Sequence, residues 1–202
     1  MTDKNKNHSR HSIRLPEYDY SQPGDYFITI DTHGHKCLLG AVVDGQIRLN
    51  RYGVTVLEVW KSLPTRFPQI ELGQAVVMPN HFHCILTIVD TPEQEGNQEP
   101  VWAIHELPIQ GRQVELKKSN QEPPSQDGND RIARRKMTIP LVVGYLKMNT
   151  AKKINESRGT PGIPVWHRNY WEHIITSDRE YETIDAYIAN NPADWMSDPE
   201  YS

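Results

Sequence analysis

The chain has few of the features that mark secreted, membrane or cysteine-dependent proteins. Its two cysteines, Cys37 and Cys84, are far apart and match no Cys-x-x-Cys spacing, so we expect neither a disulfide framework nor a cysteine metal site. No stretch approaches the roughly 20 apolar residues of a membrane span, and the N-terminal residues lack the apolar core of a signal peptide. We therefore expect a soluble, cytoplasmic protein with no membrane partner.

The chain also lacks the excess of basic residues that is typical of nucleic-acid-binding proteins, since its net charge is −4. Between residues 91 and 130, however, eight acidic residues accompany three basic ones, so this segment carries −5 and the remainder +1. The segment is rich in Pro, Gln, Glu, Asn and Gly, which predicts a largely disordered insertion. The net charge therefore permits a nucleic-acid partner without indicating one.

A length of 202 residues suits one domain that carries an insertion. We divide the chain into a basic flexible arm, one interrupted domain and a tail: residues 1–20, residues 21–195 with the acidic insertion at 91–130, and residues 196–202. Basic residues cluster in the arm and directly after the insertion, where Arg134 and Arg135 are candidate contacts for DNA phosphates. Such clusters also fit solvated segments, so charge alone does not decide their role.

Hydrophobic periodicity predicts the order of the secondary structure. Runs of β-branched and aromatic residues predict strands over 25–30, 71–78 and 83–89, and a hairpin that pairs 36–39 with 46–49 across an Asp-Gly turn. Helical spacing predicts helices over 51–67, with a break at Pro64, and over 139–154. Residues 165–175 fit strands or an extended loop, and a capping box at Ser177 and Glu180 begins a last helix. This order indicates an α+β domain with helices on an antiparallel sheet.

The pair His81 and His83 is the most informative pattern in the chain. Because side chains alternate across a strand, the two imidazoles project from one face while Phe82 points into the core. Two neutral imidazoles leave coordination positions open for a third ligand and for substrate oxygens, so the pair suits Zn²⁺, Mn²⁺ or Mg²⁺. A His-x-His sequence also occurs by chance at the start of a strand, so a metal site needs a second element.

That second element is the end of the last helix. Tyr187 and Asn191 are four residues apart and so lie on one helical face, and Pro192 stops the helix directly afterwards. A tyrosine hydroxyl there would lie beside a metal that is held in part by the Asn191 amide oxygen. The spacing also fits a tyrosine at the edge of the core, because apolar residues form a stripe along the same helix.

Three motifs, in this order, resemble the REP-associated tyrosine transposases and, more distantly, the single-tyrosine HUH transposases of small insertion sequences. They are MPNHFHCIL at 78–86, VWHRNYWEHII at 165–175 and YIANNP at 187–192. The resemblance spans about residues 20–90 and 137–195 and leaves out the arm and the insertion. It implies the HUH endonuclease core, an RRM-like or ferredoxin-like antiparallel sheet that carries the paired histidines beside a helix that supplies the tyrosine.

The resemblance also implies a chemistry. It assigns Tyr187 as the nucleophile and His81, His83 and Asn191 as ligands of Mg²⁺ or Mn²⁺. The implied activity is that of an endonuclease and strand transferase, which cleaves single-stranded or hairpin DNA, such as repeat palindromes, through a covalent 5′-phosphotyrosine. Members of the family work as monomers or as homodimers, and the sequence does not decide between the two.

Further candidates come from the same motifs. His173 lies in the Trp-Glu-His stretch and is a second candidate catalytic residue, although a histidine bonded to a backbone carbonyl fits as well. Lys147 and Arg168 are candidate phosphate contacts, and each also fits a solvated side chain. We expect Trp166 and Trp171 to be core residues rather than platforms on which bases stack.

Other interpretations remain open at this point. Tyr145 is a competing nucleophile, because some HUH transposases place theirs on a helix after the strand pair, but the Asn-Pro context favours Tyr187. A catalytically inactive DNA-binding protein derived from a transposase would keep the fold. A hydrolase with a His-x-His metal centre would cut without a tyrosine intermediate. The acidic insertion departs from the family pattern, and its charge would repel DNA if it lay over the active face.

Overall fold

The computed structural model describes residues 18–90 and 137–195. Most of the expected basic arm, the 91–130 insertion, the 196–202 tail, Arg134 and Arg135 lie outside these residues, so the expectations for them stay predictions. Among the helices of the two described ranges, none has both the length and the apolar character to cross a membrane.

The elements follow the predicted order. The first half of the chain contains β1 (Gly24–Asp31), the 3-10 helix η1 (His33–His35), β2 (Gly40–Val43), β3 (Gln46–Leu49), α1 (Arg51–Lys61), α2 (Leu63–Arg66), β4 (Ile70–Val77) and β5 (His81–Ile88). The second half contains α4 (Thr138–Arg158), β6 (Trp171–Ile175) and α5 (Asp178–Asn190).

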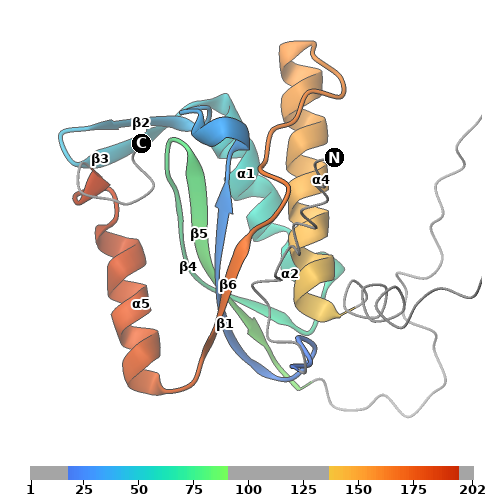
Figure 1. The fold of residues 1–202 in the computed structure, drawn as a ribbon, viewed down its shortest axis with the longest axis vertical. Helices are drawn as coiled ribbons and strands as arrows, with labels where there is room; N and C mark the ends of the chain where they lie inside the picture. The colour runs from blue at the N-terminus through green and yellow to red at the C-terminus, as the bar shows by residue number, and fades with distance from the viewer. Residues whose placement is uncertain (1–17, 91–136, 196–202) are drawn as a thin grey trace, which may run out of the picture.

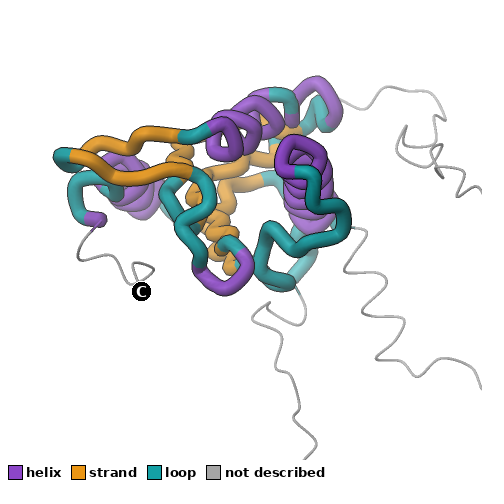
Figure 2. Tube along the Cα trace, turned by 90° about the horizontal axis from the view of Figure 1, so that it is seen from above, coloured by secondary structure: helices purple, strands orange, loops and turns teal. Residues whose placement is uncertain are grey.

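Four strands form one sheet in the order β4-β5-β1-β6, and every neighbouring pair in it is antiparallel. The sequence β1-α1-β4-β5-α4-β6 is the β-α-β-β-α-β arrangement of ferredoxin-like folds. Helices α1 and α4 lie on one side of the sheet and α5 lies on the other, as Figure 1 shows. Seen from above in Figure 2, the strands run between these helical layers. The predicted α+β fold with helices packed on an antiparallel sheet is confirmed.

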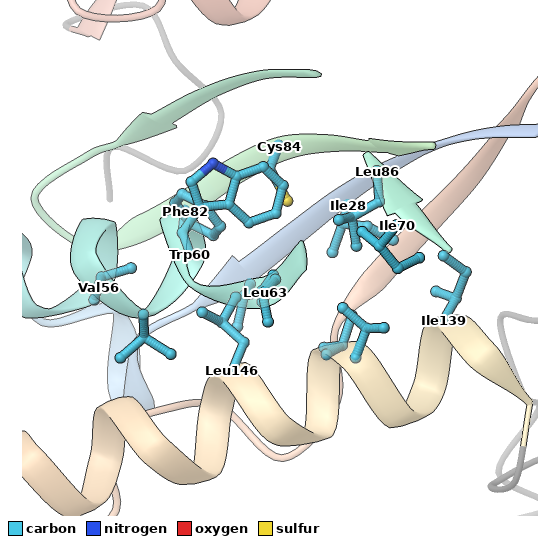
Figure 3. Packing of buried hydrophobic residues seen from close by; sticks show 14 of the residues in the cluster. Ile28, Val56, Trp60, Leu63, Ile70, Phe82, Cys84, Leu86, Ile139 and Leu146 are labelled. Carbon is cyan, nitrogen blue, oxygen red and sulfur yellow. The ribbon is translucent and has the colours of Figure 1, made fainter. Parts of the chain in front are cut away.

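The main core fills the space between the sheet and the helices α1 and α4. Alternate residues of β1 and β5 are buried on this side, namely Tyr26, Ile28, Ile30, Phe82, Cys84, Leu86 and Ile88. They meet Val56 and Trp60 of α1 and Ile139 and Leu146 of α4, as Figure 3 shows. The Phe82 ring lies 5.4 Å from the Trp60 ring, so Phe82 points into the core as its position between two histidines predicts.

A smaller core lies on the opposite side of the sheet, under α5. Its buried members are Phe27, Ile85, Ile175 and Ile188, and Tyr181 and Ile184 pack against them. Because odd-numbered residues of β1 and β5 face this side, the smaller core and the paired histidines share one face of the sheet. Helix α5 is therefore held against the face that carries the histidines.

Turn chemistry explains where the boundaries differ from the prediction. The first strand of the hairpin is 40–43 instead of 36–39, because Asp44 and Gly45 form a two-residue turn with φ values of 53° and 69° and so pair Val43 directly with Gln46. Strand β5 begins at His81, so both histidines belong to it. Helix α4 continues to Arg158. The next residue, Gly159, ends the helix because it adopts the left-handed conformation, with φ of 64°.

Candidate active site

The two histidines lie side by side on β5, a central strand of the sheet. Their ring centroids are 4.3 Å apart, and the side chains are buried, with 0% of His81 and 3% of His83 exposed. The structure therefore gives the pair a common face, as alternation along a strand requires. The two side chains are more buried than histidines at the start of an exposed strand would be.

Each ring has one nitrogen engaged by a neighbouring side chain. His83 Nδ1 is 2.9 Å from Thr29 Oγ1, on the residue that pairs with it in β1. His81 Nδ1 is 2.8 Å from Asn80 Oδ1, and since an amide oxygen only accepts, His81 Nδ1–H is the donor. With Nδ1 protonated, a neutral His81 ring has its lone pair on Nε2, whereas the Thr29 hydroxyl can donate to or accept from His83 Nδ1. Such partners orient a histidine toward a metal in many metal sites.

Burial also sets the protonation state of His83. Loss of solvation lowers the pKa of His83 well below its ordinary value, and the neighbouring His81 lowers it further. His83 is therefore neutral at physiological pH. A neutral imidazole is the form that binds metal ions.

Tyr187 reaches the histidine pair from α5. Its hydroxyl lies 3.4 Å from Nε2 of His83, although the two residues are 104 positions apart in the sequence. The Tyr187 ring stands edge-on to Phe27, with centroids 6.1 Å apart, and 40% of the residue is exposed. The structure thus brings the predicted nucleophile to the predicted metal ligands and leaves it open to a large substrate.

The competing nucleophile lies on the other side of the sheet. Tyr145 belongs to α4, packs against the main core, and stands edge-on to Phe67 with centroids 5.5 Å apart. Because the sheet separates this core from the face that carries His81 and His83, the geometry favours Tyr187 over Tyr145.

Asn191 directly follows the last residue of α5 and keeps helical dihedral angles, with φ of −51° and ψ of −39°. It is buried, with 2% exposed. Residues before and after it in the chain contact the histidine pair. The Tyr187 ring lies beside that of His83, and the Trp195 ring centroid is 5.9 Å from that of His81. This path is compatible with the predicted role of Asn191 as a further ligand.

Asp31 is a residue of the site that sequence reasoning missed. It pairs with His81 in the β1–β5 register and so faces the same side of the sheet. Its Oδ1 atom is buried and has no hydrogen-bond partner within residues 18–90 and 137–195. Asp31 therefore adds carboxyl oxygens to the same face of the sheet as the histidine pair. Only the register between β1 and β5, which the sequence does not state, reveals it.

These donors are chemically suited to a divalent cation. Two neutral imidazoles and an amide oxygen, with a carboxylate nearby, are ligand types that Mn²⁺, Mg²⁺ and Zn²⁺ accept. Within the described ranges, no three His, Cys, Asp or Glu side chains converge as a metal site by themselves. The predicted set of metal ligands differs from such a cluster, because its third ligand is the Asn191 amide.

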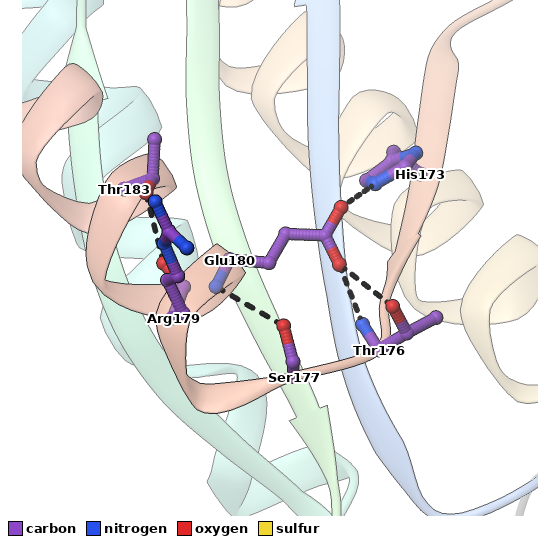
Figure 4. A network of polar contacts seen from close by, with 6 residues as sticks. All are labelled: His173, Thr176, Ser177, Arg179, Glu180 and Thr183. Carbon is purple, nitrogen blue, oxygen red and sulfur yellow. Dashed lines mark hydrogen bonds and ion pairs between the residues drawn. The ribbon is translucent and has the colours of Figure 1, made fainter.

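His173 has a defined partner at the start of α5. Its Nε2 lies 2.6 Å from Glu180 Oε1, while Glu180 Oε2 accepts hydrogen bonds from the backbone N–H and the hydroxyl of Thr176 at 2.7 and 3.0 Å (Figure 4). The Thr176 backbone N–H first, and then the His173 and Thr176 side chains, lower the pKa of Glu180 to about 2. The partner of His173 is thus a carboxylate instead of a backbone carbonyl. A catalytic role for His173 stays a prediction.

Lys147 holds a loop in place. Its Nζ donates to the backbone carbonyls of His167, Arg168 and Asn169 at 2.8, 3.0 and 3.1 Å. Arg168 lies on this loop with an exposed side chain. Lys147 therefore positions the loop that presents Arg168, and direct contact of either residue with phosphate stays a prediction.

The two tryptophans of the second motif differ. Trp166 is buried, with 6% exposed, and its Nε1 donates to Thr150 Oγ1 at 2.8 Å, so the prediction of a core residue is confirmed. For Trp171 the same prediction is wrong, because 41% of this residue is exposed. Trp171 is the first residue of β6, which is an edge strand of the sheet, and an edge strand has no neighbour on one side to cover it.

Comparisons with known proteins were made for the whole chain. No family model matches it. An uncharacterised protein of Haemophilus influenzae is 35% identical over 197 residues, which cover 96% of this chain and 94% of that protein. The solved structure of a REP-associated tyrosine transposase bound to a REP hairpin matches with a TM-score of 0.50 and 17% identity, over 89% of this chain and 72% of that chain. The chain therefore belongs to the family of this Haemophilus influenzae protein, and it has the fold of a REP-associated tyrosine transposase.

Proposed function

We propose that this protein is a metal-dependent, transposase-like endonuclease and strand transferase, which cleaves single-stranded or hairpin DNA through a covalent tyrosine intermediate. The observation that carries the proposal is the Tyr187 hydroxyl, 3.4 Å from Nε2 of His83 within the paired histidines. The solved structure of the same fold is a transposase bound to a REP hairpin, which supports hairpin DNA as the class of substrate. The work would take place in the bacterial cytoplasm, on the nucleoid.

In this proposal His81, His83 and Asn191 hold Mg²⁺ or Mn²⁺. The proposal is supported by the neutral His83 ring, by the engaged Nδ1 atoms of both histidines, and by the carboxylate of Asp31 beside them. When it is bound, such a cation supplies positive charge that polarises a scissile phosphate. His83 is a weak base because its pKa is depressed, so its Nε2 is better suited to binding a cation than to removing the Tyr187 proton.

Tyr187 performs the covalent step. Its phenol oxygen attacks the phosphorus, a bond from that oxygen to phosphorus forms, and the bond from phosphorus to the 3′-oxygen breaks. The phenol loses one proton and the departing 3′-oxygen gains one. The DNA 5′ to the break then ends in a free 3′-hydroxyl, while the DNA 3′ to it stays attached through its 5′-phosphate. Attack by another 3′-hydroxyl on this ester rejoins strands without ATP.

The test is to incubate labelled hairpin oligonucleotides with the protein and Mg²⁺ or Mn²⁺, and to separate the products under denaturing conditions. We expect a label on the 3′ portion of the DNA to migrate with the protein, and a label on the 5′ portion to be released. Tyr187→Phe should abolish the adduct because it removes the attacking oxygen. Tyr145→Phe is the matched control, since it removes the same atom from a tyrosine across the sheet, and it should leave the adduct in place.

The other functions give different results in the same assay. A catalytically inactive DNA-binding protein would retain the hairpin under native conditions and leave it uncut. A hydrolase would cut the DNA without an adduct, and Tyr187→Phe would still cut. An adduct that persists in Tyr187→Phe would refute the assignment of the nucleophile.

A further inference from the structure

A groove of about 720 Å³ opens beside the Tyr187 centre, between β6 and the first turns of α5. Its lining includes Phe27, Trp171, His173, Arg179 and Glu180. Phe27 connects the groove to the site, because its ring centroid lies 5.4 Å from those of both Trp171 and His83 and 6.1 Å from that of Tyr187. If a phosphate of a DNA strand lies at Tyr187, the nucleotides next to that phosphate can therefore reach this groove.

The lining of the groove includes two stacked rings, those of Trp171 and His173. Trp171 and His173 are two residues apart on β6 and so lie on the same face. Their rings are parallel to within 4°, with centroids 5.7 Å apart. Trp171 is an exposed aromatic residue in the described part of the chain, with 41% of its surface accessible. Glu180 Oε1 lies 2.6 Å from His173 Nε2, which orients the His173 ring against which the Trp171 ring stacks. A preformed aromatic plane is the feature on which nucleobases stack.

The register of the sheet places this pair relative to the histidines. Trp171 pairs with Thr29 in β1, and Thr29 pairs with His83 in β5, so the three residues form one row across three strands. Neighbouring strands are about 4.8 Å apart, so the row separates Trp171 from His83 by roughly 10 Å at the backbone. This separation corresponds to one or two nucleotides along a DNA strand.

Charge in the groove agrees with a DNA strand. Arg179 is an exposed cation of the lining, available to a backbone phosphate. Glu180 is the acidic residue of the same lining, and its two oxygens already accept hydrogen bonds from His173 and Thr176. The carboxylate is thus partnered, so its charge opposes an approaching phosphate less than a free one would.

We propose that this groove binds one unpaired nucleobase of the DNA strand, stacked on Trp171 and adjacent to the phosphate that Tyr187 attacks. The proposal rests on the proposed function and deepens it by assigning a site for a flanking nucleotide. It makes Trp171 a substrate-binding residue.

The test measures DNA binding in the Tyr187→Phe background, so that cleavage does not interfere. Fluorescence anisotropy with a hairpin that carries a single-stranded flank gives the dissociation constant. We expect Trp171→Ala to weaken binding about tenfold or more, because a stacked base contributes that order of affinity, and Trp171→Phe to recover most of it. Met148→Ala is the control, since Met148 is a large exposed side chain on α4, outside this groove; it should bind as the parent does.

A set of flanks that each lack one base locates the stacked nucleotide. With the parent protein, removal of one particular base should weaken binding as strongly as Trp171→Ala does. In Trp171→Ala the same removal should have no further effect, because the contact is already lost. Equal losses in both proteins at every position would overturn the site, as would an unchanged affinity of Trp171→Ala.

These results separate the two proposals. If the wild-type protein forms the tyrosine adduct and Trp171→Ala in the Tyr187→Phe background binds DNA as tightly as the parent, this site alone is overturned. If no adduct forms but the base and Trp171 depend on each other in binding, the site stands and the covalent mechanism fails. A parent protein that binds none of the oligonucleotides would overturn both.

Discussion

At the scale of single residues, the hydrogen bonds around the two histidines decide which atoms face the substrate. Asn80 engages Nδ1 of His81 and Thr29 engages Nδ1 of His83, which orients the Nε2 side of each ring away from these two partners. The neighbours of the histidine motif are thus part of its chemistry. Without such partners, the imidazole rings of a His-x-His sequence would have no fixed orientation.

The metal proposal predicts a large loss of Mn²⁺ affinity on removal of either imidazole. His81→Ala and His83→Ala should each weaken binding at least tenfold by isothermal titration calorimetry, because loss of even an outer partner of a metal ligand commonly costs that much. His167→Ala removes an exposed imidazole on the 159–170 loop and should bind Mn²⁺ as the parent protein does. Unchanged affinity in both variants of the pair would remove the metal site.

The sequence predicts some of these residues and not others, for a physical reason. His81, His83 and Tyr187 follow from alternation along a strand and from spacing along a helix, which are local properties. Asp31 and the exposure of Trp171 depend on which strand pairs with which residue, and on β6 being at an edge of the sheet. Those are long-range properties, and no short segment of the chain encodes them.

At the scale of elements, the start of α5 connects the helix to β6. Ser177 Oγ accepts a hydrogen bond from the backbone N–H of Glu180 at 3.3 Å, which is half of the predicted capping box. The Glu180 carboxylate turns back to Thr176 and His173 instead of to the backbone of Ser177. The cap therefore fixes the direction in which α5, with Tyr187 near its other end, leaves the sheet.

This cap predicts a pH dependence of stability. The pKa of Glu180 falls from 4.5 to about 2 on folding, so its contribution is present above the unfolded value and is lost as the pH falls toward 2. Glu180→Gln should therefore be less stable than the parent protein at neutral pH, and the difference should shrink in acid. Urea unfolding at several pH values measures it.

The matched control for the cap is Glu182→Gln, which removes one negative charge from the same helix at an exposed position. It should leave the stability close to that of the parent protein across the same pH range. An equal loss of stability in the two variants would mean that net charge, and not the cap, produces the effect.

Element boundaries were predicted best where the backbone itself gives the signal. Ser177 is the N-cap of α5, as its capping-box pattern predicts, whereas α4 continues four residues beyond the predicted 154 until Gly159 ends it. The first strand of the hairpin lies four residues further along the chain than the apolar runs predict, because the Asp44-Gly45 turn is tighter than the six residues, 40–45, between the two predicted strands. Turn type, more than hydrophobicity, fixed its register.

At the scale of the whole molecule, the two faces of the sheet have different roles. The face toward α1 and α4 holds the main core, and the face toward α5 holds the histidine pair with a core of four buried residues. The order of elements is readable from the sequence, but the position of β1 between β5 and β6 is not. That placement brings Thr29 and Phe27 between the histidines and the Trp171 groove.

Charge is the other property of the whole molecule, and it leads to a prediction about DNA affinity. Replacing the eight acidic residues of the 91–130 segment by their amides keeps the length and changes the net charge from −4 to +4. At low salt we expect the variant to bind single-stranded DNA more tightly than the parent, because a negative field slows and weakens association with a polyanion. The advantage should largely disappear near 1 M salt, where the Debye length is about 3 Å.

Anisotropy titrations over a range of salt concentrations measure both effects, and thermal unfolding of the two proteins checks that the packed domain is unchanged. Equal affinity of the two proteins at low salt would mean that the acidic segment does not act on the DNA through its field. An advantage that persists undiminished at high salt would mean that the substitutions create direct contacts with the DNA. Because Trp171 stacking is not electrostatic, its contribution to affinity should survive the same increase in salt, which separates the groove from the overall charge.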